Sequence, residues 1–285
     1  MTTLIAKLLL FLFPALPGTN PSHITQAAHM AYYVSDLNRA RGYYKDFLGF
    51  EEAFTVKNPD GSDHIAYIKI NDRQYILLYA EPVKNHGFLH DAAFETTDAA
   101  AFHKELAASG VKVSPGLTKD GSGDLVFQVT DTYGFTILVI QYQNDSMTGK
   151  TKGKFMPANR ISERIDHLGL LLGEREAASK FYTDTFGFVS EGDGSKQRIG
   201  AGPDRFELGF ERKPPTVDRF HVKNHICLSV KDVPAVANAL RAKPAAKNYR
   251  EIETHKLDNG KNVAELYDPD GNRIELMEPP KLKRR

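Results

Sequence analysis

The sequence has little that would point to disulfides, nucleic acids or a membrane. Its single cysteine, Cys227, excludes an internal disulfide and a cysteine-rich zinc site. Lysine and arginine total 37 and aspartate and glutamate 36, so the formal net charge is +1. No global field therefore favours nucleic acid as a partner. No apolar run is long enough to span a bilayer, and stable membrane insertion is not expected.

The two ends of the chain differ in composition from the rest. Lys7 precedes an apolar run over residues 8–13, and three prolines follow by residue 21. Residues 1–26 fit the core of a signal peptide, which would imply a periplasmic or secreted protein. They equally fit a disordered arm on a cytoplasmic protein. Folding is expected to begin near Ala27, and residues 281–285 are expected to form a solvated basic tail.

One pattern of strand, helix and about three further strands returns four times along the chain. The units begin near His29, Asp91, Ile165 and Asn224. The first and third match almost position for position, since HMAYYVSDLNRARGYYKDFLGF corresponds to HLGLLLGEREAASKFYTDTFGF. Each unit is too small to bury its own sheet, so the four units are expected to pair into two domains.

The predicted fold class is therefore α+β, with an N-terminal domain over residues 27–142 and a C-terminal domain over residues 164–280. With 41% hydrophobic residues, the 285-residue chain can bury one large core or two ordinary ones. Residues 143–163 are polar, contain Gly149 and Gly153, and show no sustained apolar period. They are predicted to form an interdomain linker.

Short motifs at the two ends of this repeat resemble a known family. They are Asp36-Leu37, Tyr43-Tyr44 and Leu48-Gly49-Phe50 in the first unit, and Asp268-Pro269-Asp270-Gly271 with Ile274-Glu275-Leu276 in the last. From about residue 27 to residue 279 the units resemble βαβββ modules of the vicinal oxygen chelate superfamily. That superfamily includes glyoxalase I, bleomycin-resistance proteins and extradiol dioxygenases. The resemblance implies open, cup-shaped mixed sheets with helices outside, and a small-molecule substrate.

The resemblance also implies one divalent metal in a cup, bound by the first and last strands of two modules. In the second domain these strands supply His167, Glu207, His225 and Glu275. Strand alternation agrees, because each of the four lies opposite an aliphatic face, as Glu275 lies opposite Ile274 and Leu276. Two imidazoles and two carboxylates suit Zn, Ni, Mn, Co or Fe(II). One or two coordination positions would remain for water or a substrate.

The N-terminal domain lacks a matching set of ligands. His29 corresponds to the first histidine of the second domain, but Leu77-Leu78 stand where an acid is needed. Asp91 and Leu138 take the places of the second histidine and the last glutamate. This domain is predicted to be metal-free, and His29 is predicted to be a buried, hydrogen-bonded histidine.

Three functions are compatible with this reading. In a glyoxalase-I-like isomerase or lyase, Glu275 or Glu207 would move a proton between neighbouring carbons of a substrate with vicinal oxygens. In an extradiol-type dioxygenase, His167, His225 and Glu275 would hold Fe(II). However, the signature of that family has a tyrosine at the position that Glu265 occupies in this chain. The third alternative is a resistance-type protein that binds a small molecule without catalysis. The sequence leaves open whether the chain forms a homodimer.

Overall fold

The computed structural model describes residues 23–80, 89–172, 174–191, 196–201, 204–210, 224–257 and 260–279. Between residues 189 and 210 it describes the backbone, with the side chain of Leu208. The expected signal peptide or arm up to residue 22 and the basic tail lie outside the described residues. Among the described helices, none is long and apolar enough to cross a membrane.

The first two modules form one mixed, eight-stranded sheet in the order β2-β3-β4-β1-β5-β8-β7-β6. Its strands are β1 (Ile24–Val34), β2 (Glu51–Lys57), β3 (Asp63–Asn71), β4 (Gln74–Ala80), β5 (Leu89–Thr96), β6 (Thr118–Lys119), β7 (Leu125–Thr130) and β8 (Thr136–Gln141). Its helices are α1 (Leu37–Arg41) and α2 (Ala99–Ala108). The predicted helix over residues 38–47 continues past α1 as a π-helix, Gly42–Phe47.

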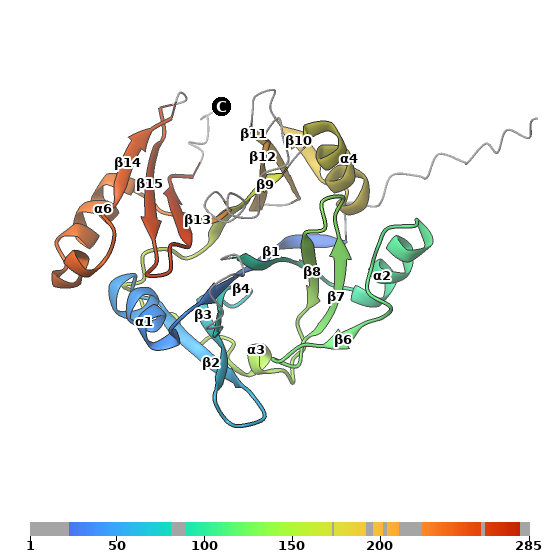
Figure 1. Cartoon of the computed structure of the whole chain (residues 1–285), viewed down its shortest axis with the longest axis horizontal. Helices are drawn as coiled ribbons and strands as arrows, with labels where there is room; N and C mark the ends of the chain where they lie inside the picture. Colours follow the sequence, from blue (N-terminus) through green and yellow to red (C-terminus); the bar gives the residue numbers. More distant parts are fainter. Residues whose placement is uncertain are drawn as a thin grey trace, which may run out of the picture.

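The last two modules repeat this arrangement in the order β10-β11-β12-β9-β13-β16-β15-β14. Their strands are β9 (Ile165–Leu172), β10 (Val189–Glu191), β11 (Lys196–Ala201), β12 (Asp204–Phe210), β13 (His225–Ser229), β14 (Glu253–Lys256), β15 (Asn262–Tyr267) and β16 (Arg273–Met277). The helices are α4 (Arg175–Phe186), α6 (Val233–Arg241) and a 3₁₀ turn, Pro244–Asn248. Four βαβββ modules thus pair into two curled sheets (Figure 1), which confirms the predicted α+β fold.

Aspartates mark the starts of three helices, because each satisfies a backbone N–H that the first turn leaves without a partner. Asp36 accepts from the Asn38 amide at 2.8 Å, Asp98 from Ala101 at 2.9 Å, and Asp232 from Ala235 at 2.8 Å. Each cap fixes the residue at which its helix begins, and therefore limits how far the preceding strand can extend.

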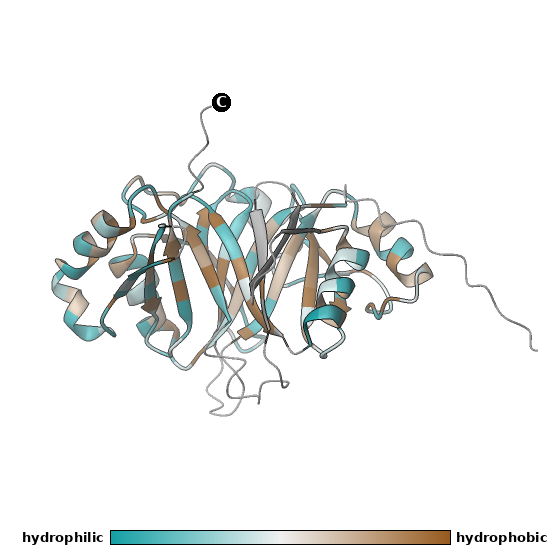
Figure 2. Ribbon diagram, turned by 90° about the horizontal axis from the view of Figure 1, so that it is seen from above, coloured by the Kyte–Doolittle hydropathy of each residue, from teal (hydrophilic) through white to brown (hydrophobic). Residues whose placement is uncertain are grey.

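The two sheets share one hydrophobic core between them and under the helices. Alternate strand residues such as Leu168, Ile226 and Ile274 are fully buried in it. Phe94 of the N-terminal sheet packs against Phe186 of α4, with ring centroids 5.7 Å apart. Figure 2 shows the apolar strand segments inside, with helices on both flanks. The opposite strand faces carry smaller apolar clusters, such as Ala31, Tyr75 and Leu77 in the N-terminal sheet.

A pair of matching tyrosine–aspartate contacts also joins the two halves. The Tyr44 hydroxyl donates to Asp268 Oδ2 at 3.2 Å, and the Tyr182 hydroxyl donates to Asp131 Oδ2 at 3.1 Å. Both aspartates open the tight turn before the last strand of a module. Burial raises the pKa of Asp268 to about 6, despite hydrogen bonds from the side chain and amide of Asn272.

Two segment boundaries differ from the sequence-based expectation. Strand β1 begins at Ile24, which is buried and pairs with Thr96, so the fold starts before Ala27. The predicted linker contains a short helix, α3 (Met147–Lys150), and it packs against the N-terminal sheet (Figure 1). The buried Lys69 ammonium donates to the Thr151 carbonyl at 2.6 Å. Polar composition did not reveal this packing, because its contacts are hydrogen bonds rather than apolar burial.

Candidate metal centre

Three of the predicted ligands meet in a buried cluster on adjacent central strands. His167 lies on β9, His225 on β13 and Glu275 on β16, and each is at most 4% exposed. The Nε2 atoms of the two histidines are 3.1 Å apart. Glu275 Oε2 lies 3.3 Å from His225 Nε2 and 3.8 Å from His167 Nε2. All three candidate ligand atoms therefore face one point.

Strand register explains how the three side chains converge. His167, Cys227 and Glu275 lie side by side in one row across β9, β13 and β16. His225 lies on β13 two residues before Cys227, and it pairs with Gly169 of β9. A Cβ atom on Gly169 would lie 2.1 Å from His225 Cε1. The glycine is therefore required for the imidazole to lie across β9 and approach the other two ligands.

Glu207, the fourth predicted ligand, is placed by its backbone. It lies on β12 and pairs with Gly169 of β9, on the side of that strand away from β13. Its side chain lies outside the described residues. The structure thus brings three predicted ligands together and puts the fourth on the next strand, in the row of His225.

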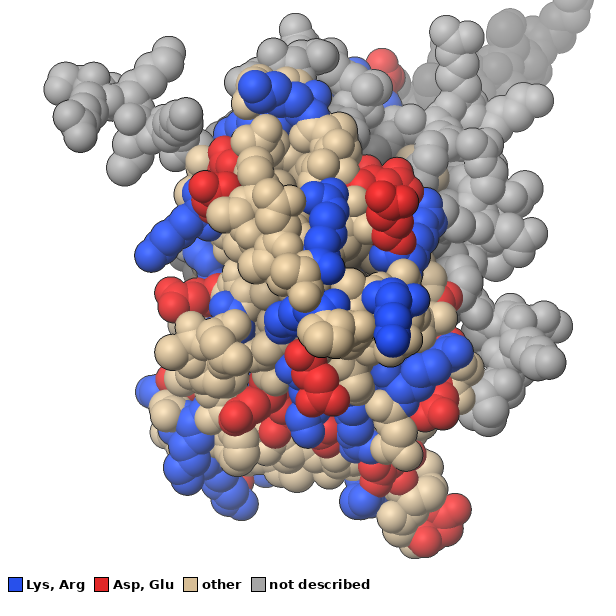
Figure 3. All heavy atoms as spheres, turned by 90° about the vertical axis from the view of Figure 1, so that its left-hand side faces the viewer, with Lys and Arg blue, Asp and Glu red and all other residues tan. Residues whose placement is uncertain are grey.

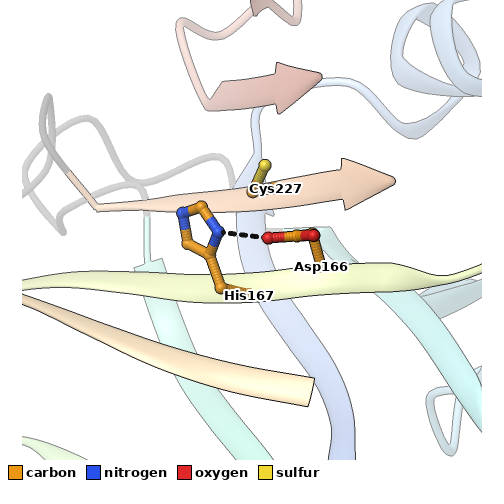
Figure 4. Close-up of side chains that lie close together, drawn as sticks. All are labelled: Asp166, His167 and Cys227. Atoms are coloured by element: carbon orange, nitrogen blue, oxygen red, sulfur yellow. Dashed lines mark hydrogen bonds and ion pairs between the residues drawn. The ribbon is translucent and has the colours of Figure 1, made fainter. Parts of the chain in front are cut away.

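Asp166 contributes a contact to the cluster that strand alternation did not anticipate. Its Oδ1 atom lies 3.0 Å from Nδ1 of His167, as drawn in Figure 4 with the buried Cys227. The pairing of β9 with β13 is irregular here, because Cys227 pairs with His167 while Leu228 pairs with Ile165. This β-bulge lets neighbouring side chains share one face.

The Asp166 contact fixes which nitrogen of His167 is available. A proton on Nδ1 donates to the Asp166 carboxylate and leaves the Nε2 lone pair directed at His225 and Glu275. Asp166, His167 and Cys227 could also form a small ligand group of their own. We take His167, His225 and Glu275 as the candidate ligands, because the contact of Asp166 with Nδ1 leaves Nε2 of His167 facing the other two.

Arg273 holds the other oxygen of Glu275. Its guanidinium pairs with Glu275 Oε1 and, at 2.8 Å, with Glu265 Oε1. The Tyr267 hydroxyl donates to Glu265 Oε2 at 3.1 Å. Burial opposes ionisation of Glu275, but His225, Arg273 and His167 together keep its pKa below the ordinary value. Glu275 is therefore an ionised carboxylate with Oε2 directed at the histidines.

The three residues fit a divalent cation. Ligand atoms about 2.1 Å from a common ion, at angles between square and tetrahedral, are separated by about 3.0–3.4 Å. Two of the three observed separations lie in this range and the third, 3.8 Å, exceeds it by a few tenths of an ångström. A carboxylate behind one histidine and a guanidinium behind the glutamate are the supports that metal ligands commonly have.

The corresponding place in the N-terminal sheet is taken by a buried, hydrogen-bonded histidine–aspartate pair. His29, 2% exposed, lies with Nε2 2.9 Å from Asp91 Oδ1, and Asp91 also contacts Nδ1 of His90. His29 is thus buried and hydrogen-bonded, as predicted. Burial disfavours the charged form of Asp91, but hydrogen bonds from His29 and His90 hold its pKa below the ordinary value.

The surface over α1 and α6 mixes both charge signs (Figure 3). A cavity of about 800 Å³ beside α1 is lined in part by Arg39, Arg250 and Asp270. Arg39 pairs with Asp270 at 2.9 Å, and Arg250 pairs with Glu253 at 2.7 Å. These charges already have partners within the protein, and none of the three clustered ligands lines this cavity.

The chain belongs to the Glyoxalase/Bleomycin resistance protein/Dioxygenase superfamily, whose family model matches residues 26–139 and 164–276. Glyoxalase I of Saccharomyces cerevisiae is 25% identical over 252 residues, which cover 78% of this chain and 69% of the yeast protein. The 4-hydroxyphenylpyruvate dioxygenase of Tetrahymena thermophila is 26% identical over 147 residues, 45% of this chain and 35% of that protein.

Solved structures share the fold at low identity. The Mn(II)-bound glyoxalase from Novosphingobium aromaticivorans aligns with a TM-score of 0.67 and 17% identity, over 90% of this chain and 83% of that chain. Homoprotocatechuate 2,3-dioxygenase from Arthrobacter globiformis aligns with a TM-score of 0.65 and 17% identity, over 93% and 82%. Glyoxalases and extradiol dioxygenases are thus both structural neighbours.

Proposed function

We propose that this protein is a divalent-metal-dependent enzyme, a glyoxalase-I-like isomerase or lyase acting on a small substrate with vicinal oxygens. The observation that carries the proposal is the convergence of His167 Nε2, His225 Nε2 and Glu275 Oε2 in a buried cluster. The likeness to yeast glyoxalase I along most of the chain supports this choice. A glyoxalase of the same fold is described as Mn(II)-bound.

In this proposal His167, His225, Glu275 and Glu207 hold the ion. A bound divalent cation would polarise the substrate oxygens and acidify the adjacent C–H bond. The donor set is compatible with Zn, Ni, Mn, Co or Fe(II).

The two glutamates are suited to different tasks. Glu275 is held by Arg273 at Oε1 and faces the histidines with Oε2, so both of its oxygens are engaged. A general base needs a carboxylate oxygen that can give up its present hydrogen-bond or ion-pair partners and accept a proton from the substrate. We therefore assign Glu275 the role of a fixed ligand, and we assign proton transfer to Glu207.

A second candidate is an extradiol-type dioxygenase. The three clustered residues alone make a two-histidine, one-carboxylate set of the kind that binds Fe(II) and leaves positions open. The fold likeness to homoprotocatechuate 2,3-dioxygenase is as extensive as that to the glyoxalase. Against it, Glu265 stands where a tyrosine is expected. Glu265 is also occupied by Arg273 and by the Tyr267 hydroxyl.

The variant Glu207→Gln separates the two candidates, because an amide is a poorer ligand and no base. The assays are metal content, proton exchange on α-hydroxycarbonyl substrates with and without a thiol, and oxygen uptake with a panel of catechols. Glu251→Gln, at an exposed position, is the control. Proton exchange that is lost in Glu207→Gln but kept in the control supports the isomerase. Rapid oxygen uptake by the wild type, undiminished in Glu207→Gln, would make the protein a dioxygenase.

A further inference from the structure

One side chain of the N-terminal half reaches the strands that carry the candidate ligands. Tyr32 lies on β1, is 1% exposed, and points into the core shared by the two sheets. Its hydroxyl accepts a hydrogen bond from the Ile226 amide at 3.0 Å and donates one to the Arg273 carbonyl at 3.1 Å. These two groups belong to β13 and β16 of the C-terminal sheet.

The register of β13 and β16 makes this contact unusual. The two strands are parallel, with Ile226 opposite Ile274 and His225 opposite Arg273. In a parallel ladder of this register, the Ile226 amide faces the Arg273 carbonyl. The Tyr32 hydroxyl bonds to both of these groups at once. It therefore joins the two strands at the step beside His225.

The contact also lies next to two of the three clustered ligands along the chain. Ile226 follows His225 directly, while Arg273 is two residues from Glu275 and pairs with its carboxylate. In the matching third module, the residue that corresponds to Tyr32 is Leu170, which has no hydroxyl. The N-terminal half therefore supplies this hydroxyl to the strands of the candidate metal centre, and Leu170 cannot supply an equivalent one to the N-terminal sheet.

We propose that Tyr32 is a positioning residue, which sets the separation of β13 and β16 and thereby the approach of His225 to Glu275. The inference rests on the proposed metal centre, and it gives the N-terminal half a task in that centre. Without the hydroxyl, the Ile226 amide and the Arg273 carbonyl either lose a partner or draw together. In both cases His225 moves relative to Glu275.

The test compares Tyr32→Phe with the wild type and with Tyr182→Phe. Tyr182 is an equally buried tyrosine, and its hydroxyl bonds across the halves to Asp131, away from the ligand strands. One readout is affinity for Mn(II), Co(II) and Zn(II), measured by competition with a chelator. The other is hydrogen exchange at the Ile226 amide in the metal-free protein, measured by NMR.

We expect Tyr32→Phe to bind metal roughly tenfold more weakly than the wild type, and its Ile226 amide to exchange faster. Tyr182→Phe should keep wild-type values of both. Wild-type affinity in Tyr32→Phe would overturn the inference and leave the proposed function standing. A wild-type protein that binds none of the three metals would contradict the proposed function, and the inference with it.

Discussion

Adding one methyl group at Gly169 should damage the candidate metal centre. The Cβ atom of an alanine would lie 2.1 Å from His225 Cε1 and 2.5 Å from both ring nitrogens. Carbon atoms in contact need about 3.5 Å, so the imidazole must move by about 1 Å or more. His225 is 4% exposed, so a displaced ring must move against closely packed neighbours. Gly169→Ala should therefore displace Nε2 from the two other ligands.

The expected effects have opposite signs at two glycines. Replacing glycine by alanine at a compatible backbone position ordinarily stabilises by about 0.4–1 kcal/mol, whereas overpacking a core costs about 1–3 kcal/mol. Gly169→Ala should lower the free energy of unfolding and weaken metal binding by roughly 100-fold. Gly116→Ala is the control, since nothing lies within 4 Å of its added Cβ. Denaturant unfolding and chelator competition give the two quantities.

A further variant checks the cause of the damage. In a His225→Ala background the clash partner is absent, so adding Gly169→Ala should cost little stability. A Gly169→Ala protein that gains stability and binds metal like the wild type would refute the close approach of His225 to β9.

Three further outcomes follow from particular contacts. Asp166→Asn should weaken metal binding about tenfold, measured by chelator competition, because a neutral amide supports the His167 imidazole less well than a carboxylate. The pKa of Asp268 is raised to about 6, so the stability due to its bound proton is complete below the unfolded pKa and is lost as pH rises through 6. Between pH 7 and pH 5 the wild type should therefore gain about 1 kcal/mol relative to Asp268→Asn in thermal unfolding, and no relative gain would contradict the burial argument. A chain starting at residue 27 should melt below one starting at residue 23, because it lacks Ile24, which is buried against the sheet.

The sequence was sufficient for the fold because its signals are local and recur along the chain. Aspartate caps stand at equivalent places in three modules, at Asp36, Asp98 and Asp232, and the aspartate turn stands before the last strand at Asp131 and Asp268. Alternation along the strands placed His225 and Glu275 on the face opposite the aliphatic core. Each of these signals depends only on residues a few positions apart.

The supports of the candidate site could not be predicted in the same way. Asp166 shares a face with His167 only because β9 has a bulge, and strict alternation assigns neighbours to opposite faces. Tyr32 meets Ile226 across the interface of two sheets, 194 positions away in the chain. Nothing local distinguishes Tyr32 from other core tyrosines. The one signal in the sequence is a tyrosine in an otherwise apolar strand, because a buried hydroxyl ordinarily has a polar partner.

The most direct test of the account is the metal content of the purified protein, with His225→Ala and His29→Ala beside the wild type. His29 lies on β1, the counterpart of β9, whereas His225 lies on β13 in the cluster with His167 and Glu275. We predict about one divalent metal per chain in the wild type and in His29→Ala, and little or none in His225→Ala, because loss of one ligand strongly weakens a compact site. Full metal occupancy in His225→Ala, or its loss in His29→Ala, would contradict the assignment of the metal centre.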